Sequence, residues 1–187
     1  MEEPLYIAIG RLSVAFSKLE DQLKDLISAL LSQDRPIGEI VTSKMTFFSL
    51  CELTKALFWH KVSDKELIDF FAELMPQIEY CAEGRNTYIH SSWNTQEPLI
   101  PYIRSKLKKG KTGELRDNWQ AMGAGDILDL TECIEETEKG LFELLLHMSI
   151  KGVTNYLSDM LGEFMPTQGM RRHFKARQKP PKPWGSH

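Results

Sequence analysis

The stretch LYIAIGRLSVAFSKLEDQLKDLISAL, residues 5–30, decides the fold of this chain. Its apolar residues follow one another in alternating steps of four and three, which is the pattern of a long helix with one apolar seam. The seam consists of Leu5, Ile9, Leu12, Phe16, Leu19, Leu23, Leu26 and Leu30. In a chain of 187 residues, a helix of this length typically forms either the spine of a bundle or the seam of a dimer.

Helical periodicity continues beyond this first helix. The stretch Arg35-Pro36-Ile37-Gly38 predicts a break, because proline cannot continue the hydrogen-bond ladder. Ser63 and Glu66 predict a capping box at the start of a third helix, and Pro76 predicts a kink or break within it. Asp126 is a candidate N-cap of a later helix. Helices are predicted over about 44–60, from 63 through the central stretch, over about 126–149 and over about 152–164.

The periodicity changes between about residues 94 and 123. Two glycines in a short polar connection predict a β-hairpin or an extended loop there, and Pro98 and Pro101 disfavour a central strand. The sequence therefore predicts an all-α protein, an up-and-down bundle of four or five helices with a short hairpin or loop insert. Residues 1–165 would form this domain, and residues 166–187 a basic, proline-rich, flexible tail.

The composition is typical of a soluble globular protein, with 42% hydrophobic and 26% charged residues. No apolar run reaches the roughly 18 residues needed to cross a bilayer, so no membrane partner is predicted. The acidic N-terminus does not resemble a signal peptide, and the three cysteines lack paired spacing, which predicts a reducing, cytoplasmic location. Neither zinc-site spacing nor a phosphate-binding or dinucleotide motif is present, so no metal and no cofactor is predicted.

The net charge of −3 hides two basic clusters. One lies in the tail, at residues 170–187, where no acidic residue occurs. The other lies in the predicted hairpin and consists of Arg104, Lys106, Lys108, Lys109, Lys111 and Arg116. Such clusters on an acidic body are compatible with a polyanionic partner, although solvated charges that keep the chain soluble are the common alternative.

The stretch EGRNTYIHSSW, residues 83–93, carries the side chains best suited to chemistry. Arg85 is a permanent cation, Asn86 supplies an amide, and His90 supplies an imidazole of the kind that exchanges protons near neutral pH. Asn86 and His90 are four residues apart and share a helix face, whereas Arg85 and His90 differ by about 140° around the helix. Arg85 can therefore meet His90 at one substrate only if its long side chain curls round or if the helix is distorted, and Pro76 and Gly84 lie just upstream, where such a distortion would be needed.

The pattern Arg85-Asn86-x-x-x-His90 resembles the R-(polar)-x-x-x-H signature of the HEPN superfamily. The resemblance implies a helical bundle, a homodimer with motifs from two protomers facing each other and, in active members, metal-independent cleavage of RNA. Arg85 would hold the phosphate, His90 would move a proton to or from the reacting oxygens, and Asn86 would orient the imidazole or bind the phosphate. Ser91 stands where a small residue, often glycine, commonly follows the histidine.

Several nearby residues are candidates for RNA contacts, each with an alternative. Tyr88 and Trp93 could stack on a base, or could form core or dimer contacts. Ser91 could contact substrate or act as a hydrogen-bonding filler, and Glu20 or Glu52 could supply a carboxylate to His90. The backbone of RNA would be collected by Lys108, Lys109 and Lys111.

The predicted function is thus that of a HEPN-type endoribonuclease that cleaves single-stranded RNA by attack of the 2′-hydroxyl. The resemblance further implies that such proteins are often toxins or defence effectors, held in check by an inhibitory, antitoxin-like partner. One alternative is a non-catalytic HEPN-like module that binds RNA, a nucleotide or a protein. Another is a helical dimerisation protein that uses the seam of residues 5–30.

Overall fold

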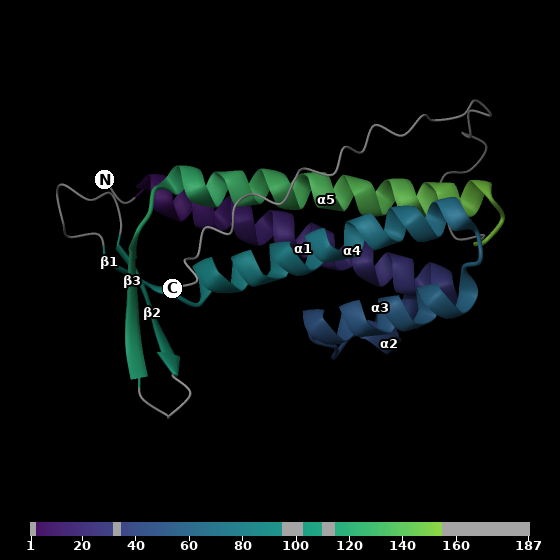
Figure 1. The fold of residues 1–187 in the computed structure, drawn as a ribbon, viewed down its shortest axis with the longest axis horizontal. Helices are drawn as coiled ribbons and strands as arrows, with labels where there is room; N and C mark the ends of the chain where they lie inside the picture. Colours follow the sequence, from purple (N-terminus) through teal and green to yellow (C-terminus); the bar gives the residue numbers. More distant parts are fainter. Residues whose placement is uncertain (1–2, 32–34, 95–102, 110–114, 155–187) are drawn as a thin grey trace.

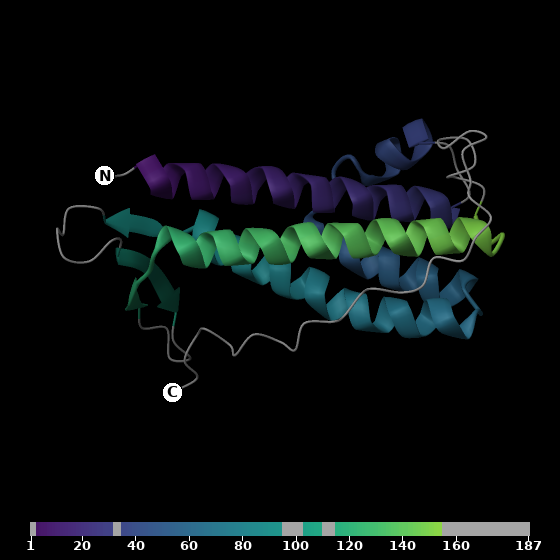
Figure 2. The same cartoon turned by 90° about the horizontal axis from the view of Figure 1, so that it is seen from above.

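The computed structural model describes residues 3–31, 35–94, 103–109 and 115–154. Its elements are α1 (Glu3–Leu31), α2 (Arg35–Thr42), α3 (Phe47–Lys61), α4 (Lys65–Ile89), β1 (Ser92–Asn94), β2 (Ile103–Lys109), β3 (Leu115–Ala121) and α5 (Ala124–Ile150). The long helices alternate in direction along the chain, so α1 and α5 run parallel to each other and α4 runs antiparallel to both (Figures 1 and 2). The predicted all-α bundle with a hairpin insert is confirmed.

Helix α1 is the spine of the bundle. Every seam residue named above is buried except Ile9, which is half-buried. These side chains pack against α3, α4 and α5 within the same protomer. Each fully buried Leu or Phe contributes about 1.5–3 kcal/mol relative to exposure. Since the seam is already covered inside the protomer, it is not available to a second copy, and the dimerisation alternative based on it is wrong.

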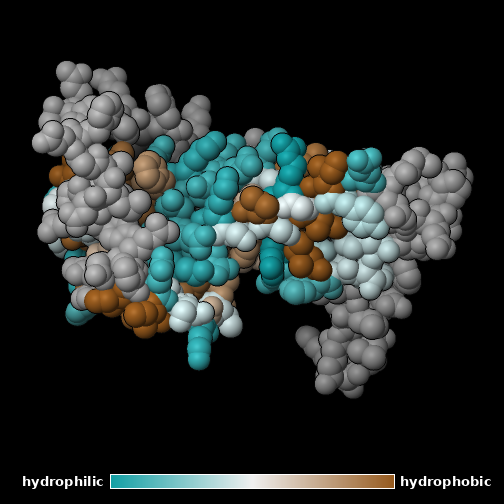
Figure 3. Space-filling model, turned by 180° about the vertical axis from the view of Figure 1, so that it is seen from behind, coloured by the Kyte–Doolittle hydropathy of each residue, from teal (hydrophilic) through white to brown (hydrophobic). Residues whose placement is uncertain are grey.

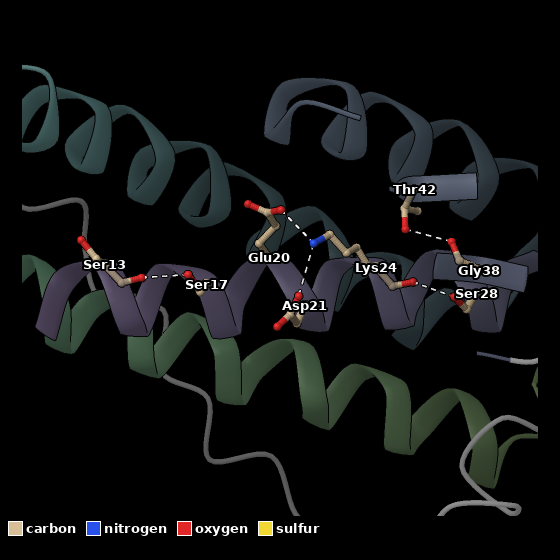
Figure 4. A network of polar contacts seen from close by, with 8 residues as sticks. All are labelled: Ser13, Ser17, Glu20, Asp21, Lys24, Ser28, Gly38 and Thr42. Carbon is tan, nitrogen blue, oxygen red and sulfur yellow. Dashed lines mark hydrogen bonds and ion pairs between the residues drawn. The ribbon is translucent and has the colours of Figure 1, made fainter. Parts of the chain in front are cut away.

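Helix α2 begins where the sequence predicted only a break. Arg35 and Pro36 form its first turn, where a missing N–H costs nothing because that donor has no partner within the helix. Helix α2 packs on α1 through small residues: a Cβ on Gly38 would lie 1.6 Å from Ser28 Oγ, so only glycine fits. The buried Thr42 hydroxyl donates to the Gly38 carbonyl at 2.8 Å (Figure 4).

Two other helix starts also differ from the prediction. The N-cap of α4 is Asp64 and not Ser63, and its carboxylate accepts a hydrogen bond from the Leu67 N–H at 3.0 Å. Helix α5 begins after Gly123, and Asp126 lies in its first turn, where its carboxylate accepts from the Gly123 N–H at 2.7 Å. In both cases an anionic acceptor satisfies an amide that the helix leaves unpaired.

Helix α4 runs unbroken through Pro76, which is exposed, so the break that was predicted as one outcome there does not occur. Helix α3 packs against its first half through the rings of Phe58 and Phe71, whose centroids lie 3.8 Å apart at an interplanar angle of 8°. Such aromatic contacts add to the burial of the two rings. The motif therefore sits on the second half of a helix whose first half is firmly packed.

The three strands form an antiparallel sheet with β2 at its centre. Strand β2 begins at Ile103, on the C-terminal side of Pro98 and Pro101, so neither proline occupies the central strand. Strand β1 was not predicted, because the sequence indicated helix through Trp93. The sheet lies at the end of the bundle where α4 ends and α5 begins (Figure 1).

None of the described helices combines the length and apolarity needed to cross a lipid bilayer.

After α5, Gly152 adopts a φ of 69°, a left-handed value that glycine takes without strain. The helix predicted over 152–164 is absent from residues 152–154, and its remainder lies outside the described residues, as does the predicted tail 166–187.

Candidate functional site

One face of the last turns of α4 packs closely on α5. A Cβ on Gly84 would lie 2.8 Å from Leu130 Cδ2 and 2.9 Å from Leu130 Cδ1, closer than such atoms normally approach. One turn later, the buried Tyr88 hydroxyl donates to the Asp126 carbonyl at 3.4 Å. Gly84 thus serves the close approach of α5. Because α4 continues unbroken to Ile89, the helix distortion that was one of the two expected ways to bring Arg85 and His90 together is not present.

Arg85 lies on a different face of α4 and contacts α1. Its guanidinium carbon is 5.1 Å from the centre of the Phe16 ring, a cation–π contact. Its Nη1 donates to Asn86 Oδ1 at 3.0 Å. Its buried Nε has no hydrogen-bond partner among the described residues. Because a guanidinium carries five N–H donors in a rigid fork, this positioned arginine keeps donors for an anionic ligand.

His90 is the C-cap residue of α4, and its side chain is exposed. Its backbone N–H donates to the Asn86 carbonyl at 3.3 Å. Asn86 therefore accepts from Arg85 through its side chain, whereas its contact with His90 is the backbone hydrogen bond that closes the last turn of the helix. An imidazole in contact with water can exchange protons with a bound substrate, which an imidazole packed in hydrocarbon could not do.

The residues after His90 secure the end of α4. The Ser91 hydroxyl donates to the Thr87 carbonyl, so Ser91 behaves as the hydrogen-bonding filler that the sequence left open. Trp93, half-buried in β1, donates from its indole Nε1 to the Tyr88 carbonyl at 3.2 Å. The Tyr88 and Trp93 rings lie nearly parallel, at 12°, with centroids 6.3 Å apart. The sheet is thereby fixed to the helix that carries the motif.

These contacts decide between the two predicted roles of the aromatic residues. Tyr88 is only 4% exposed, so it is a core residue and the prediction that it stacks on a base is wrong. Trp93 packs against that core while remaining half-exposed, which agrees with the structural alternative. Glu20 and Glu52, the carboxylates considered for His90, form ion pairs with lysines of their own helices, Lys24 (Figure 4) and Lys55.

The basic hairpin lies at the same end of the bundle as the motif (Figures 1 and 2). Strand β1 follows directly after Ser91, and Trp93 in it pairs with Arg104 of β2. Lys108 and Lys109 belong to β2, where they pair with Arg116 and Leu115 of β3. Lys111 lies outside the described residues. The fold thus places the start of β2 beside the strand that follows the Arg85–His90 segment, while Lys108 and Lys109 lie further along β2, towards the tip of the hairpin (Figure 1).

One arrangement was missed by the sequence analysis, which found no paired cysteines. Cys81 of α4 and Cys133 of α5 have their sulfur atoms 3.9 Å apart, and Cys81 Sγ is 3.5 Å from Thr137 Oγ1. The contact with Cys133 and burial raise the pKa of Cys81. Burial likewise raises the pKa of Cys51 to about 12. Thiols held protonated are poor nucleophiles, so Cys51 and Cys81 do not belong to the candidate site.

Within the described ranges, no three His, Cys, Asp or Glu side chains are grouped so that they could hold a metal ion. Comparison with family models, with curated proteins and with solved structures finds no match to this chain. The candidate site is therefore described by its own contacts: Arg85 lies over Phe16 and donates to Asn86, and His90 is exposed at the end of the same helix.

Proposed function

We propose that this chain is a metal-independent endoribonuclease of HEPN type, with Arg85, Asn86 and His90 as its reactive centre. The observation that carries the proposal is the exposed His90 at the C-terminal end of the helix that holds Arg85. Arg85 is half-buried and positioned by Phe16 and Asn86. Cleavage of a phosphodiester by an internal hydroxyl requires a cation at the phosphate and a group that transfers protons, and Arg85 and His90 would supply these from the C-terminal end of α4.

In the proposed reaction the ribose 2′-oxygen attacks the adjacent phosphorus and the bond to the 5′-oxygen of the next nucleotide breaks. The 2′-hydroxyl proton leaves to a base, and the departing 5′-oxygen receives a proton. His90 would perform one of these transfers, and Arg85 would stabilise the charge on the phosphate oxygens. The products are a 2′,3′-cyclic phosphate and a 5′-hydroxyl, with no net consumption of protons.

The surroundings of the motif favour RNA over a small phosphate ester. Strand β2, which carries Arg104, Lys106, Lys108 and Lys109, begins its pairing with β1 next to the end of α4. Basic residues along a strand attract an extended polyanion, and this attraction weakens as salt rises. A homodimer would supply a second His90, so that one imidazole could remove a proton while the other delivers one. An inhibitory protein, as the resemblance implies, would act by covering His90.

The test is cleavage of end-labelled single-stranded RNA by the full chain in EDTA. We expect cleavage by the wild type, and a loss of at least about a hundredfold in His90→Ala, the scale on which general acid–base catalysis contributes. His60→Ala is the matched control, because His60 is also an exposed histidine but lies on α3. That variant should cleave at the wild-type rate.

Arg85→Lys separates catalysis from charge. Lysine keeps the cation but loses the planar fork, so cleavage should fall while salt-dependent RNA binding persists. RNA binding without cleavage by the wild type, weakened in Arg85→Ala, would instead support the non-catalytic module. Equal cleavage by His90→Ala and wild type would contradict the proposal.

A further inference from the structure

Helices α4 and α5 meet along a line of close contacts that includes two thiols. Cys81 of α4 faces Cys133 of α5, with the sulfur atoms 3.9 Å apart. Three residues later on α4 and three residues earlier on α5, Gly84 faces Leu130. Equal steps in opposite directions are what antiparallel helices produce, so both contacts belong to one register. The contact between α4 and α5 lies in front of α1 in the view of Figure 1, away from the face shown in Figure 3.

The close approach of the two helices brings the sulfur atoms together. Because Gly84 has no side chain, α5 comes so near that a Cβ there would lie 2.8 Å from Leu130 Cδ2. A disulfide requires Cβ atoms about 3.5–4.5 Å apart, a spacing that favours closely packed helices. At 3.9 Å no other atom fits between the sulfurs of Cys81 and Cys133. Their approach to the bonded distance of about 2.05 Å is therefore unobstructed.

Thr137 orients the sulfur atom of Cys81. Its hydroxyl donates its single hydrogen to the Cys133 carbonyl at 2.7 Å, so toward Cys81 Sγ, 3.5 Å away, it acts as an acceptor. The Cys81 thiol therefore donates to Thr137, and its sulfur lone pairs are left to face Cys133. Cys81 and Thr137 are both fully buried. The fold thus directs a sulfur nucleophile at Cys133 and shields it from solvent.

The two thiols differ in their access to solvent. Cys133 is half-buried, whereas Cys81 is fully buried. A small oxidant dissolved in water therefore meets Cys133 first, and Cys81 reacts through Cys133. An accessible cysteine beside a second cysteine is the arrangement in which oxidation stops at a disulfide and does not continue to irreversible sulfur acids.

We propose that Cys133 and Cys81 form a reversible redox site whose oxidant is hydrogen peroxide. The Cys133 thiolate attacks one peroxide oxygen, the O–O bond breaks, and Cys133 sulfenic acid and hydroxide form. The Cys81 sulfur then attacks the Cys133 sulfur, and the sulfenic hydroxyl leaves as water with the Cys81 proton. Overall, two thiols lose two electrons and two protons to form one disulfide, and one peroxide is reduced to two waters. A dithiol reductant reopens the bridge by thiol–disulfide exchange.

The bridge would hold the part of α4 that carries the motif against α5. Arg85 follows Cys81 by about one helical turn. Cys81 and Cys133 are 52 residues apart in sequence, and the loop that they close contains the motif and the hairpin. Closing a loop of this length restricts the unfolded chain, which stabilises the folded state. The inference concerns oxidation of the fold and does not depend on RNA cleavage.

The test is peptide mapping by mass spectrometry of the full wild-type chain, treated with hydrogen peroxide while folded and then alkylated without reduction. We expect one linked pair of peptides, containing Cys81 and Cys133, with Cys51 recovered as a thiol. Dithiothreitol should remove the link. The thermal midpoint of the oxidised protein should exceed that of the reduced protein by about 5–15 °C. The matched control is the same treatment in guanidinium chloride, where the unfolded chain should give a mixture of cysteine pairings.

Two variants test the order of the steps. Cys81→Ala should stop at Cys133 sulfenic acid, which dimedone traps, and Cys133→Ser should give neither the bridge nor the trapped product. Cys51→Ala should form the bridge at the wild-type rate. The proposal would be overturned if the folded wild type formed no Cys81–Cys133 link, or if its oxidised form had a thermal midpoint no higher than the reduced form. Dimedone adduct on Cys81 in Cys133→Ser would also overturn it, because the buried thiol would then react directly with the oxidant.

Discussion

Replacing Gly84 with alanine tests whether α5 holds the motif helix at a fixed distance. The new methyl group would lie 2.8 and 2.9 Å from the two terminal carbons of Leu130. Alanine is favoured over glycine inside a helix by about 1 kcal/mol. Forcing an extra methyl into a packed contact costs about 1–3 kcal/mol. The two effects oppose each other, and we expect Gly84→Ala to lower the free energy of unfolding by about 0–2 kcal/mol.

Two further variants separate these opposing effects. Ala72 is exposed on the same helix, so Ala72→Gly measures the helix preference of alanine in α4 without the contact. Leu130 is 6% exposed, and Leu130→Ala should cost about 2–5 kcal/mol through the cavity it leaves. Leu130→Ala also removes the atoms that crowd position 84. The double variant Gly84→Ala with Leu130→Ala should therefore be more stable, by about 1–3 kcal/mol, than the sum of the two single changes in unfolding free energy predicts.

The assay is urea unfolding followed by circular dichroism, with all four variants and the wild type at one protein concentration. A coupling free energy near zero between positions 84 and 130 would refute the reasoning. The reasoning would also be refuted if Gly84→Ala raised the free energy of unfolding by as much as Ala72→Gly lowers it, since the added methyl group would then meet no steric obstacle. Either result would mean that α4 and α5 are further apart than the structure places them.

Three other predictions concern the rest of the chain. Leu19 is fully buried in the seam of α1, so Leu19→Asp should lower the free energy of unfolding by more than about 4 kcal/mol. Circular dichroism should then show no cooperative unfolding transition, whereas a seam used only between two copies would leave a folded monomer. The Lys151 ammonium, 2.7 Å from Asp64, holds the Asp64 pKa below its ordinary 3.8. The ion pair therefore stabilises the folded state above about pH 4, and this stabilisation is lost as the pH falls through the Asp64 pKa of the folded protein. Lys151→Ala should therefore lower the thermal midpoint at pH 7 and have little effect at pH 2. Burial raises the Cys51 pKa to about 12, so mass spectrometry after brief alkylation at pH 8 should find the half-buried Cys133 modified well before Cys51.

The sequence predicted the parts of the fold that depend on local pattern. The spacing of Leu5 through Leu30 required one buried stripe, and α1 buries it. Helix α2 was missed because Pro36 indicates a break, yet proline is well suited to a first helical turn. Whether the seam met helices of its own chain or a second copy could not be read from its spacing, since both use the same pattern.

The candidate site was predictable in its residue types and not in its surroundings. Arg85, Asn86 and His90 stand close in sequence, so a motif could reveal them. The reason for Gly84 lies at Leu130, on another helix, and the burial of Tyr88 depends on α5 and on Trp93 of β1. Such contacts between distant segments leave no local periodicity. For the same reason the approach of Cys81 to Cys133 had no signal in the sequence.

The most direct test of the account is to identify the ends of RNA that the full chain cuts in EDTA. We expect fragments with 2′,3′-cyclic phosphate and 5′-hydroxyl ends, released by the wild type and by His60→Ala but not by His90→Ala. Fragments that carry 3′-hydroxyl ends, or identical fragments from His90→Ala at the wild-type rate, would contradict it.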